Sequence, residues 1–263
     1  MTDHEGDAHP VVRYEARGRV GIVTLARPEA RNAVNGEVAT AIESHFDQLE
    51  ADPEIWAAIV TGDGGVFCAG ADLKSIARTG GRDAFTKRGG FAGLARRERT
   101  KPLIAAVEGH ALAGGCEIVL ACDLVVASRR ATFGLPEVKR SLVAAGGAMF
   151  RLPQRIPSVV AMELLLTGDS IDAQRAFDLG LINRVVEPGD ALAAALQLAE
   201  RINENAPLAV RTTRAVALAA QHTSEEEGWR LSRDALRAVA QTDDYREGPR
   251  AFVEKRAPVW TGR

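Results

Sequence analysis

Two apolar segments, each followed by a glycine-rich loop, constrain the fold of this chain most strongly. WAAIVTG (56–62) runs into DGGVFCAGAD (63–72), and PLIAAVEGHA (102–111) runs into ALAGGCE (111–117). Short continuous apolar runs are typical of buried strands, and GGCEIVLACD has the pattern of a short helix. Because strand–loop–helix units repeat in this order, the sequence predicts an α/β fold.

The flanking segments extend this prediction. VVRYEA (11–16) and VGIVTLA (20–26) are typical of a β-hairpin, EVATAIESHFDQLEA (37–51) of an amphipathic helix, and DLVVAS (123–128) of a further strand. Residues 78–101 are rich in glycine, lysine and arginine, which favours a solvated loop or surface helix that could also act as a lid.

The domain organisation follows from a change of pattern after about residue 145. Residues 189–255 are dominated by helical periodicity, and no linker separates two independent domains. We therefore expect a disordered polar tail over 1–10, a single α/β core over 11–200, and a helical region over 201–263. The helical region either packs on neighbouring subunits or covers the core of its own chain.

Composition excludes several classes of partner. The chain has 33 basic and 35 acidic residues, so no broad positive field recommends nucleic acid or a membrane surface. The polar start is a poor signal peptide, and the most apolar window is interrupted by Glu117 and Asp123. Three cysteines at no disulfide-like or zinc-like spacing read as reduced thiols, and the histidines show no metal-binding spacing. These observations favour a cytoplasmic protein without a metal.

Glu117 stands out because it lies in the otherwise small and apolar stretch GHALAGGCEIVLACD (109–123). Burying an unpaired carboxylate is costly. Glu137 follows twenty positions later in GLPEV, and the intervening strand could carry the chain out and back. Two carboxylates flanking one water can divide acid and base roles. Spacing alone leaves open the other interpretation, in which Glu137 is on the surface and Glu117 pairs with a basic side chain.

The two glycine loops also have two interpretations. They are either tight strand-to-helix turns or sites where backbone N–H groups approach an anionic group, and two such donors from separate loops would form an oxyanion hole. Neither loop matches a dinucleotide-binding or P-loop motif, and no nucleophile elbow is present. Cys116 is expected to be a small buried residue rather than a nucleophile.

Several motifs together resemble the enoyl-CoA hydratase/isomerase, or crotonase, family. They are FCAGADLKSI (67–76), AVEGHALAGGCEIVLACDLVVAS (106–128), FGLPEV (133–138) and AFDLGLINRVV (176–186). The resemblance spans about residues 11–263 in the family's order. It implies a crotonase-like spiral of β-β-α units with a helical C-terminal oligomerisation region, assembled as a homo-oligomer that is a trimer or a dimer of trimers.

The resemblance also implies a reaction. The chain would be an enoyl-CoA hydratase that adds water to a trans-2-enoyl-CoA, with the N–H groups of Ala71 and Gly114 binding the thioester oxygen. Glu117 would direct the water to Cβ and Glu137 would deliver a proton to Cα. Coenzyme A is part of the substrate, and no further cofactor is implied. The residues matching the coenzyme A arm are Ala30, Arg31, Ala69, Asp72 and Lys74.

Departures from the family pattern leave alternatives open. Residues 144–151 replace a Gly-Gly-Thr-Gln-Arg run common in hydratases, and Ala113 replaces a common glycine. Met149 and Phe150 are either core residues or walls of the acyl pocket, and the core is the preferred interpretation. The alternatives are an enoyl-CoA isomerase, a dehydratase of a polar 3-hydroxyacyl-CoA of the carnitinyl type, or a non-catalytic scaffold that binds acyl-CoA.

Overall fold

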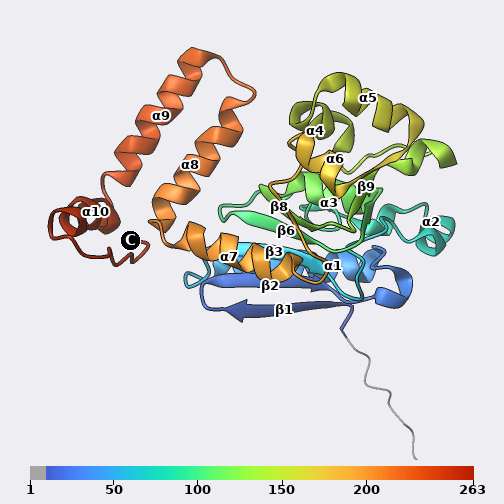
Figure 1. Ribbon diagram of the computed structural model, residues 1–263, viewed down its shortest axis with the longest axis horizontal. Coiled ribbons are helices and arrows are strands. Elements are labelled where there is room, and N and C mark those ends of the chain that lie inside the picture. The colour runs from blue at the N-terminus through green and yellow to red at the C-terminus, as the bar shows by residue number, and fades with distance from the viewer. Residues whose placement is uncertain (1–9) are drawn as a thin grey trace, which may run out of the picture.

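A computed structural model describes residues 10–263, so the expected tail lies almost entirely outside the described residues (Figure 1). A six-stranded sheet forms the centre, in the order β1-β2-β3-β6-β8-β11. β1 and β2 form the predicted antiparallel hairpin, and the remaining pairs are parallel. The strands are β1 (Val12–Arg17), β2 (Val20–Leu25), β3 (Ala57–Gly62), β6 (Leu103–Val107), β8 (Leu124–Ser128) and β11 (Arg184–Val186).

A second, three-stranded sheet has the order β10-β9-β7. Its strands are β7 (His110–Leu112), β9 (Thr132–Gly134) and β10 (Ser170–Asp172). β7 directly follows β6, and β9 directly follows β8, so the chain passes from the large sheet to the small one twice. The glycine loops and the short helix α3 (Gly114–Ala121) lie at this passage. The α/β prediction is confirmed.

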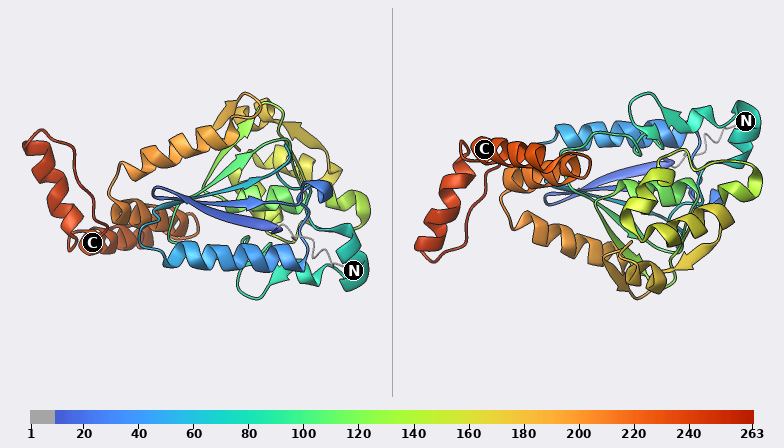
Figure 2. Two further views of the ribbon diagram at one scale, coloured as in Figure 1. Left: turned by 90° about the horizontal axis from the view of Figure 1, so that it is seen from below. Right: turned by 90° about the horizontal axis from the view of Figure 1, so that it is seen from above.

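Helices cover the two faces of the large sheet, as Figure 2 shows for α1 (Gly36–Ala51) and α7 (Ala191–Asn203). Alternate residues of β2 serve different faces: Val23 and Leu25 join the core beneath α1, whereas Val20 and Ile22 join a smaller core beneath α7. α1 begins where the Asn35 side chain accepts a hydrogen bond from the Val38 N–H at 3.0 Å.

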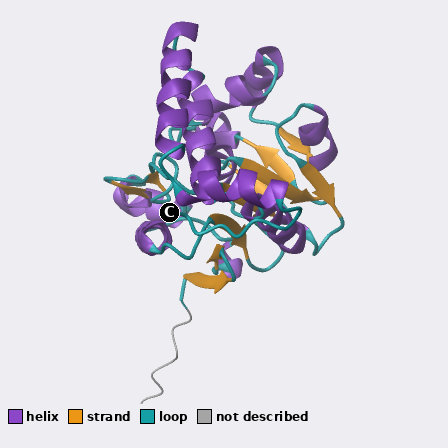
Figure 3. Cartoon of the chain, turned by 90° about the vertical axis from the view of Figure 1, so that its left-hand side faces the viewer, coloured by secondary structure: helices purple, strands orange, loops and turns teal. Residues whose placement is uncertain are grey.

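The remaining helices fall into two groups. α2 (Leu73–Thr79), α4 (Ala148–Arg155), α5 (Ser158–Thr167) and α6 (Ala173–Asp178) surround the small sheet and α3. The predicted helical C-terminal region is α8 (Pro207–Ala220), α9 (Glu225–Val239) and α10 (Asp243–Val253). Figures 1 and 3 show that α8 and α9 project away from the sheet as an antiparallel pair.

Residues 78–101 differ from the expected solvated segment. After α2 they form a short two-stranded sheet, β4 (Phe85–Thr86) with β5 (Gly90–Phe91). Phe91 and Leu94 are buried in the main core. The apolar side chains anchor the second half of the segment despite its many charges, because burying a Phe or Leu side chain is worth roughly 1.5–3 kcal/mol.

Within residues 10–263, no helix combines the length and apolar character needed to cross a membrane.

Candidate active site

The two glycine-rich loops pack directly on each other. The Leu112 N–H donates to the Cys68 oxygen at 3.0 Å, and the Cys68 N–H donates to the His110 oxygen at 3.0 Å. A side chain on Gly70 would lie 3.0 Å from the Gly114 nitrogen, and one on Gly115 would lie 2.1 Å from the Cys68 oxygen. Only glycine permits this approach, so these positions bring the start of α3 against the first loop.

Ala71 and Gly114 both line one cavity, which holds about 470 Å³. Gly114 is the first residue of α3, so its N–H has no partner inside the helix. Ala71 pairs with Val34 through the N–H and C=O groups of its neighbours. Neither N–H donates to another group of the described chain, which leaves both available to an acceptor in the cavity.

Glu117 lines the same cavity from α3 and is only 3% exposed. Its pKa is raised to about 7, mainly by burial and in smaller part by the nearby charge of Glu137, while hydrogen bonds from backbone N–H groups act in the other direction. One of these comes from the Ala148 N–H, 3.2 Å from Oε1, at the start of α4. The carboxyl group is therefore poised to exchange a proton near neutral pH.

Glu137 reaches the cavity from a 3₁₀ turn over Pro136–Arg140, which proline begins. Its Oε2 atom is buried and has no hydrogen-bond partner among the described residues. Burial raises the pKa of this carboxyl as well. The structure thus brings the two glutamates to one cavity. It does not show the other interpretation, in which Glu137 lies on the surface and Glu117 pairs with a basic side chain.

The residues expected along the coenzyme A arm divide into two groups. Arg31 and Ala69 line the cavity, whereas Ala30, Asp72 and Lys74 do not. Asp72 begins α2, where its side chain accepts the Lys74 N–H at 3.0 Å, and it lies 3.3 Å from the Arg27 guanidinium. Lys74 is exposed on α2.

Sequence reasoning missed the apolar walls of the cavity. They come from scattered positions in α2, the β4–β5 segment and the loop before α4, so no local motif marked them. The side chains are Leu73, Ile76, Phe85, Phe91, Leu142 and Val143.

The expectation that Met149 and Phe150 belong to the core was wrong. Their exposed fractions are 49% and 58%. α4 starts after Gly147, whose φ is +117°, and the helix turns Ala148 and Leu152 inward instead. Phe150 borders a different cavity, away from the glutamates.

Ala113 carries backbone strain at the edge of the site. Its φ of 50° with ψ of −127° is a conformation that alanine rarely adopts. Replacing Ala113 by glycine is expected to raise the free energy of unfolding by about 1 kcal/mol, because the relieved strain exceeds the extra entropy of the unfolded glycine chain. Urea unfolding of the two proteins measures the difference, and a destabilised variant would contradict the strain.

Residues 10–263 contain no group of three or more His, Cys, Asp and Glu side chains arranged to bind a metal ion.

Comparison with known proteins gives consistent likenesses. A family profile described as enoyl-CoA hydratase/isomerase matches residues 15–263. The chain is 43% identical to an enoyl-CoA hydratase, EchA19, of Mycobacterium tuberculosis over 263 residues, covering 98% of each protein. It is 40% identical to a carnitinyl-CoA dehydratase of Proteus mirabilis over 253 residues, covering 94% of this chain and 97% of the relative.

Solved structures give the same result. An enoyl-CoA hydratase from Mycobacterium tuberculosis H37Rv is similar with a TM-score of 0.92 and 48% identity, covering 97% of this chain and 100% of the other. A carnitinyl-CoA dehydratase from Mycobacterium avium 104 is similar with a TM-score of 0.75 and 46% identity, at the same coverage of both chains.

Proposed function

This chain belongs to the enoyl-CoA hydratase/isomerase family, and from that membership we propose that its paired glutamates catalyse the reversible addition of water to a trans-2-enoyl-CoA. The family and the crotonase-like fold expected from the sequence are confirmed. The observation that carries the proposed mechanism is that Glu117 and Glu137 line one cavity together with two unused backbone N–H groups.

The N–H groups of Ala71 and Gly114 would bind the thioester carbonyl oxygen. Negative charge grows on this oxygen when a nucleophile adds at Cβ, because the product of that step is enolate-like. Donors that are already fixed stabilise this charge without reorganising, and removing one such donor typically costs about 10²–10³ in rate. The close packing of the two glycine loops would hold both N–H donors in place.

Glu117 and Glu137 would handle the water. Ionised Glu117 takes a proton from the water molecule while the water oxygen bonds to Cβ. Protonated Glu137 gives a proton to Cα. The net reaction adds H and OH across the double bond, so electrons and protons balance without a redox cofactor. Burial raises the pKa of both carboxyls, so either can carry a proton, and the hydrogen bond from the Ala148 N–H stabilises the ionised form of Glu117.

The proposal is tested with purified protein, crotonyl-CoA and D₂O. The expected product is 3-hydroxybutyryl-CoA with one deuterium at Cα, detected by mass spectrometry. Migration of the double bond without net hydration would identify an isomerase. Tight binding of enoyl-CoA thioesters without any turnover would identify the non-catalytic scaffold and contradict the proposal.

Arg31 and Ala69 are the residues proposed to contact the coenzyme A arm, since both line the cavity. Arg31 offers a guanidinium to a phosphate oxygen. For Ala30 and Lys74 we propose contacts nearer the cavity's outer edge. Asp72 would act indirectly, because it begins α2 and holds Arg27.

We propose an apolar acyl group rather than a cationic one of the carnitinyl type. Four cavity residues leave large apolar surface exposed: Leu73 56%, Phe85 43%, Leu142 39% and Val143 63%. Apart from the two glutamates, the charged side chains lining this cavity are Arg31 and Arg140. Arg31 and Arg140 would repel a trimethylammonium group, whereas a hydrocarbon chain would cover the exposed apolar surface.

This preference predicts a dependence on chain length. Each buried methylene is worth about 0.8 kcal/mol, so trans-2-octenoyl-CoA is expected to have kcat/KM up to about 10² times that of crotonyl-CoA. Leu142→Ser should reduce that advantage about tenfold while leaving crotonyl-CoA turnover unchanged. Leu166→Ser, the same substitution at an exposed position of α5 outside the cavity, is the matched control. Faster turnover of a trimethylammonium-bearing enoyl-CoA than of octenoyl-CoA would contradict the assignment.

The protein is proposed to act as a homo-oligomer, a trimer or a dimer of trimers. The C-terminal helical region exposes large apolar side chains that a second copy would cover, including Trp229 61%, Leu236 61% and Phe252 85%. Sedimentation equilibrium is expected to give three or six chains per particle, and a monomer at micromolar concentration would contradict this.

The three buried cysteines, all reduced, support a cytoplasmic location.

A further inference from the structure

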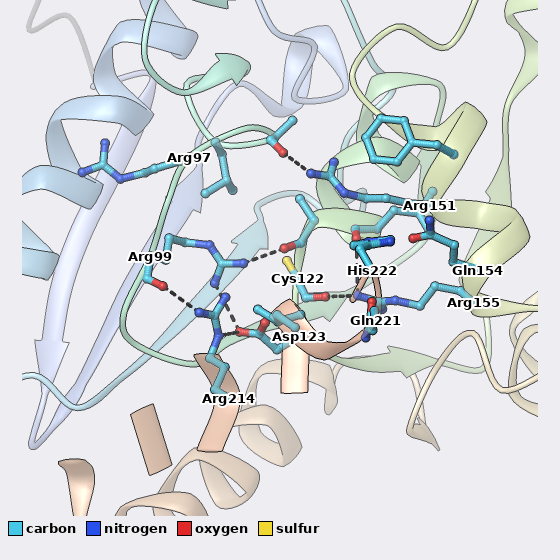
Figure 4. Close-up of a pocket in the computed structure, with 16 residues that line it drawn as sticks. Arg97, Arg99, Cys122, Asp123, Arg151, Gln154, Arg155, Arg214, Gln221 and His222 are labelled. Atoms are coloured by element: carbon cyan, nitrogen blue, oxygen red, sulfur yellow. Dashed lines mark hydrogen bonds and ion pairs between the residues drawn. The ribbon is translucent and has the colours of Figure 1, made fainter. Parts of the chain in front are cut away.

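A second cavity, of about 340 Å³, lies at the opposite end of α3 from the glycine loops (Figure 4). We call it the arginine cavity, because arginines from three segments line it. Those arginines are Arg97 and Arg99 from the loop before β6, Arg151 and Arg155 from α4, and Arg214 from α8. Asp123 is the one carboxylate among the lining residues. The lining therefore carries a large excess of positive charge.

Asp123 balances only part of that charge. It lies 3.2 Å from the Arg99 guanidinium and 2.8 Å from that of Arg214. In Figure 4, Arg151 and Arg155 lie on the side of Cys122 and Asp123 that is opposite to Arg99 and Arg214. Arg97 pairs with Asp47, which does not line the cavity.

Arg151 and Arg155 bond to backbone instead of carboxylates. Arg151 donates to the Ala95 oxygen at 2.7 Å, and Arg155 donates to the Leu120 oxygen at 3.3 Å. In residues 10–263 neither guanidinium has a carboxylate within ion-pair distance. Carbonyl groups satisfy N–H donors but carry no net charge, so two cations remain without a counterion from the described chain.

Several of the arginines that line the cavity are also partly removed from water. The side chains of Arg97 and Arg99 are 7% and 6% exposed, and their Nε atoms are buried without a partner in the described residues. Burial, followed by the charges of Arg155 and Arg99, lowers the pKa of Arg151. Like charges held close together in a poorly solvated site are costly, and a bound anion would offset that cost.

We propose that the arginine cavity binds an oxyanion of the phosphate class, either inorganic phosphate or the phosphate end of a small metabolite. Guanidinium groups present paired N–H donors that match two oxygens of such an anion. Gln154, Gln221 and His222 also line the cavity and add polar groups around it (Figure 4). The volume exceeds that of phosphate alone, which leaves room for an attached organic group.

The arginine cavity shares two helices with the active site. Leu120 and Ala121 at the end of α3 line it, and Glu117 lies one turn earlier on the same helix. α4 carries Arg151 and also the Ala148 N–H that holds Glu117. An anion bound across these elements would fix α4 against α3 and thereby hold the carboxylate in place.

Thermal unfolding tests the site directly, in phosphate and in chloride at equal ionic strength. Phosphate at saturating concentration is expected to raise the midpoint of the native protein by several degrees, since a ligand that binds only the folded state stabilises it. Gln154→Glu places a carboxylate at the cavity from an exposed position, so it should raise the midpoint in chloride and remove the phosphate effect. Gln197→Glu, the same change on an exposed position of α7, should keep the phosphate effect.

Titration calorimetry measures how many phosphate ions bind per chain, and it tests a second variant. One phosphate per chain is expected, and Arg155→Gln should weaken its binding at least tenfold. The Gln154→Glu arm also separates this site from any site for the coenzyme A phosphates, because Gln154 does not line the other cavity. An absent phosphate-specific shift in the native protein, or an equal shift in Gln154→Glu, would overturn the proposal. A third outcome would also overturn it: phosphate has no effect on the native protein, and Arg155→Gln causes the oligomer to dissociate. The arginine cavity would then bind an acidic group of a second copy of the chain.

Discussion

Glu117→Gln is expected to lower kcat/KM for enoyl-CoA hydration by about 10³-fold, within the range that a positioned general base contributes. The amide cannot accept a proton from water, yet it has nearly the same shape, so enoyl-CoA should still bind. Steady-state kinetics and calorimetric titration with a saturated acyl-CoA measure the two quantities. An exposed glutamate of α5, Glu163, gives the matched control, and Glu163→Gln should retain full activity.

The same substitution should stabilise the fold in a pH-dependent way. Burial raises the pKa of Glu117 from 4.5 to about 7. A carboxyl with a raised pKa in the folded state favours folding when protonated, so its contribution is fully present below pH 4.5 and is lost as the pH rises through 7. Glu117→Gln removes that loss, and the free energy of unfolding at pH 8 should rise by about 2–3 kcal/mol.

Urea unfolding at pH 5 and pH 8 checks this result. At pH 5 the native carboxyl is largely protonated, so the variant and the native protein should differ little. Native-like turnover in Glu117→Gln would show that Glu117 does not exchange a proton with the substrate water. Equal stability of the two proteins at pH 8 would show that ionised Glu117 does not cost stability.

Gly114→Ala is expected to lower kcat by about 10²-fold while leaving the chain folded, because it displaces the donor for the thioester oxygen. The added Cβ would lie 2.2 Å from the Phe91 ring, which is itself 3% exposed and packs edge-on against Phe85. Either the ring or the start of α3 must shift, and misplacing a fixed donor by about 1 Å removes much of its effect.

Gly228 provides the matched control for this substitution. It lies within α9, and a Cβ there would have no heavy atom within 4 Å. Gly228→Ala should therefore keep full activity and gain about 1 kcal/mol of stability, since alanine favours helix over glycine by that amount. Unchanged kcat in Gly114→Ala would argue against an oxyanion hole at the start of α3.

The strands and helices that place Glu117 were predictable because their patterns are local. Residues 56–62 and 102–111 are continuous apolar runs, and the glycines that follow permit only tight loops. The motifs around Glu117 and Glu137 also indicated the family, which the comparisons confirm. The two interpretations of the glutamate pair, however, could not be separated by spacing, since twenty residues of chain can bring two side chains together or apart.

Other features were decided only by tertiary packing. The expected solvated segment over residues 78–101 is anchored by Phe91, whose ring is buried against Gly114 at the start of α3, a residue distant in sequence. Met149 and Phe150 are exposed because Gly147 sets the direction in which α4 begins.

By itself, the sequence determined the order of the elements, the family and the identity of both glutamates, because these depend on local periodicity and short motifs. The tertiary structure decided which side chains share a cavity. It placed Phe85, Leu142 and Val143 beside the glutamates, and it gathered arginines of three distant segments around Asp123. Such groupings depend on how helices pack across the sheet, and hydrophobic burial, which drives that packing, acts between residues far apart in the chain.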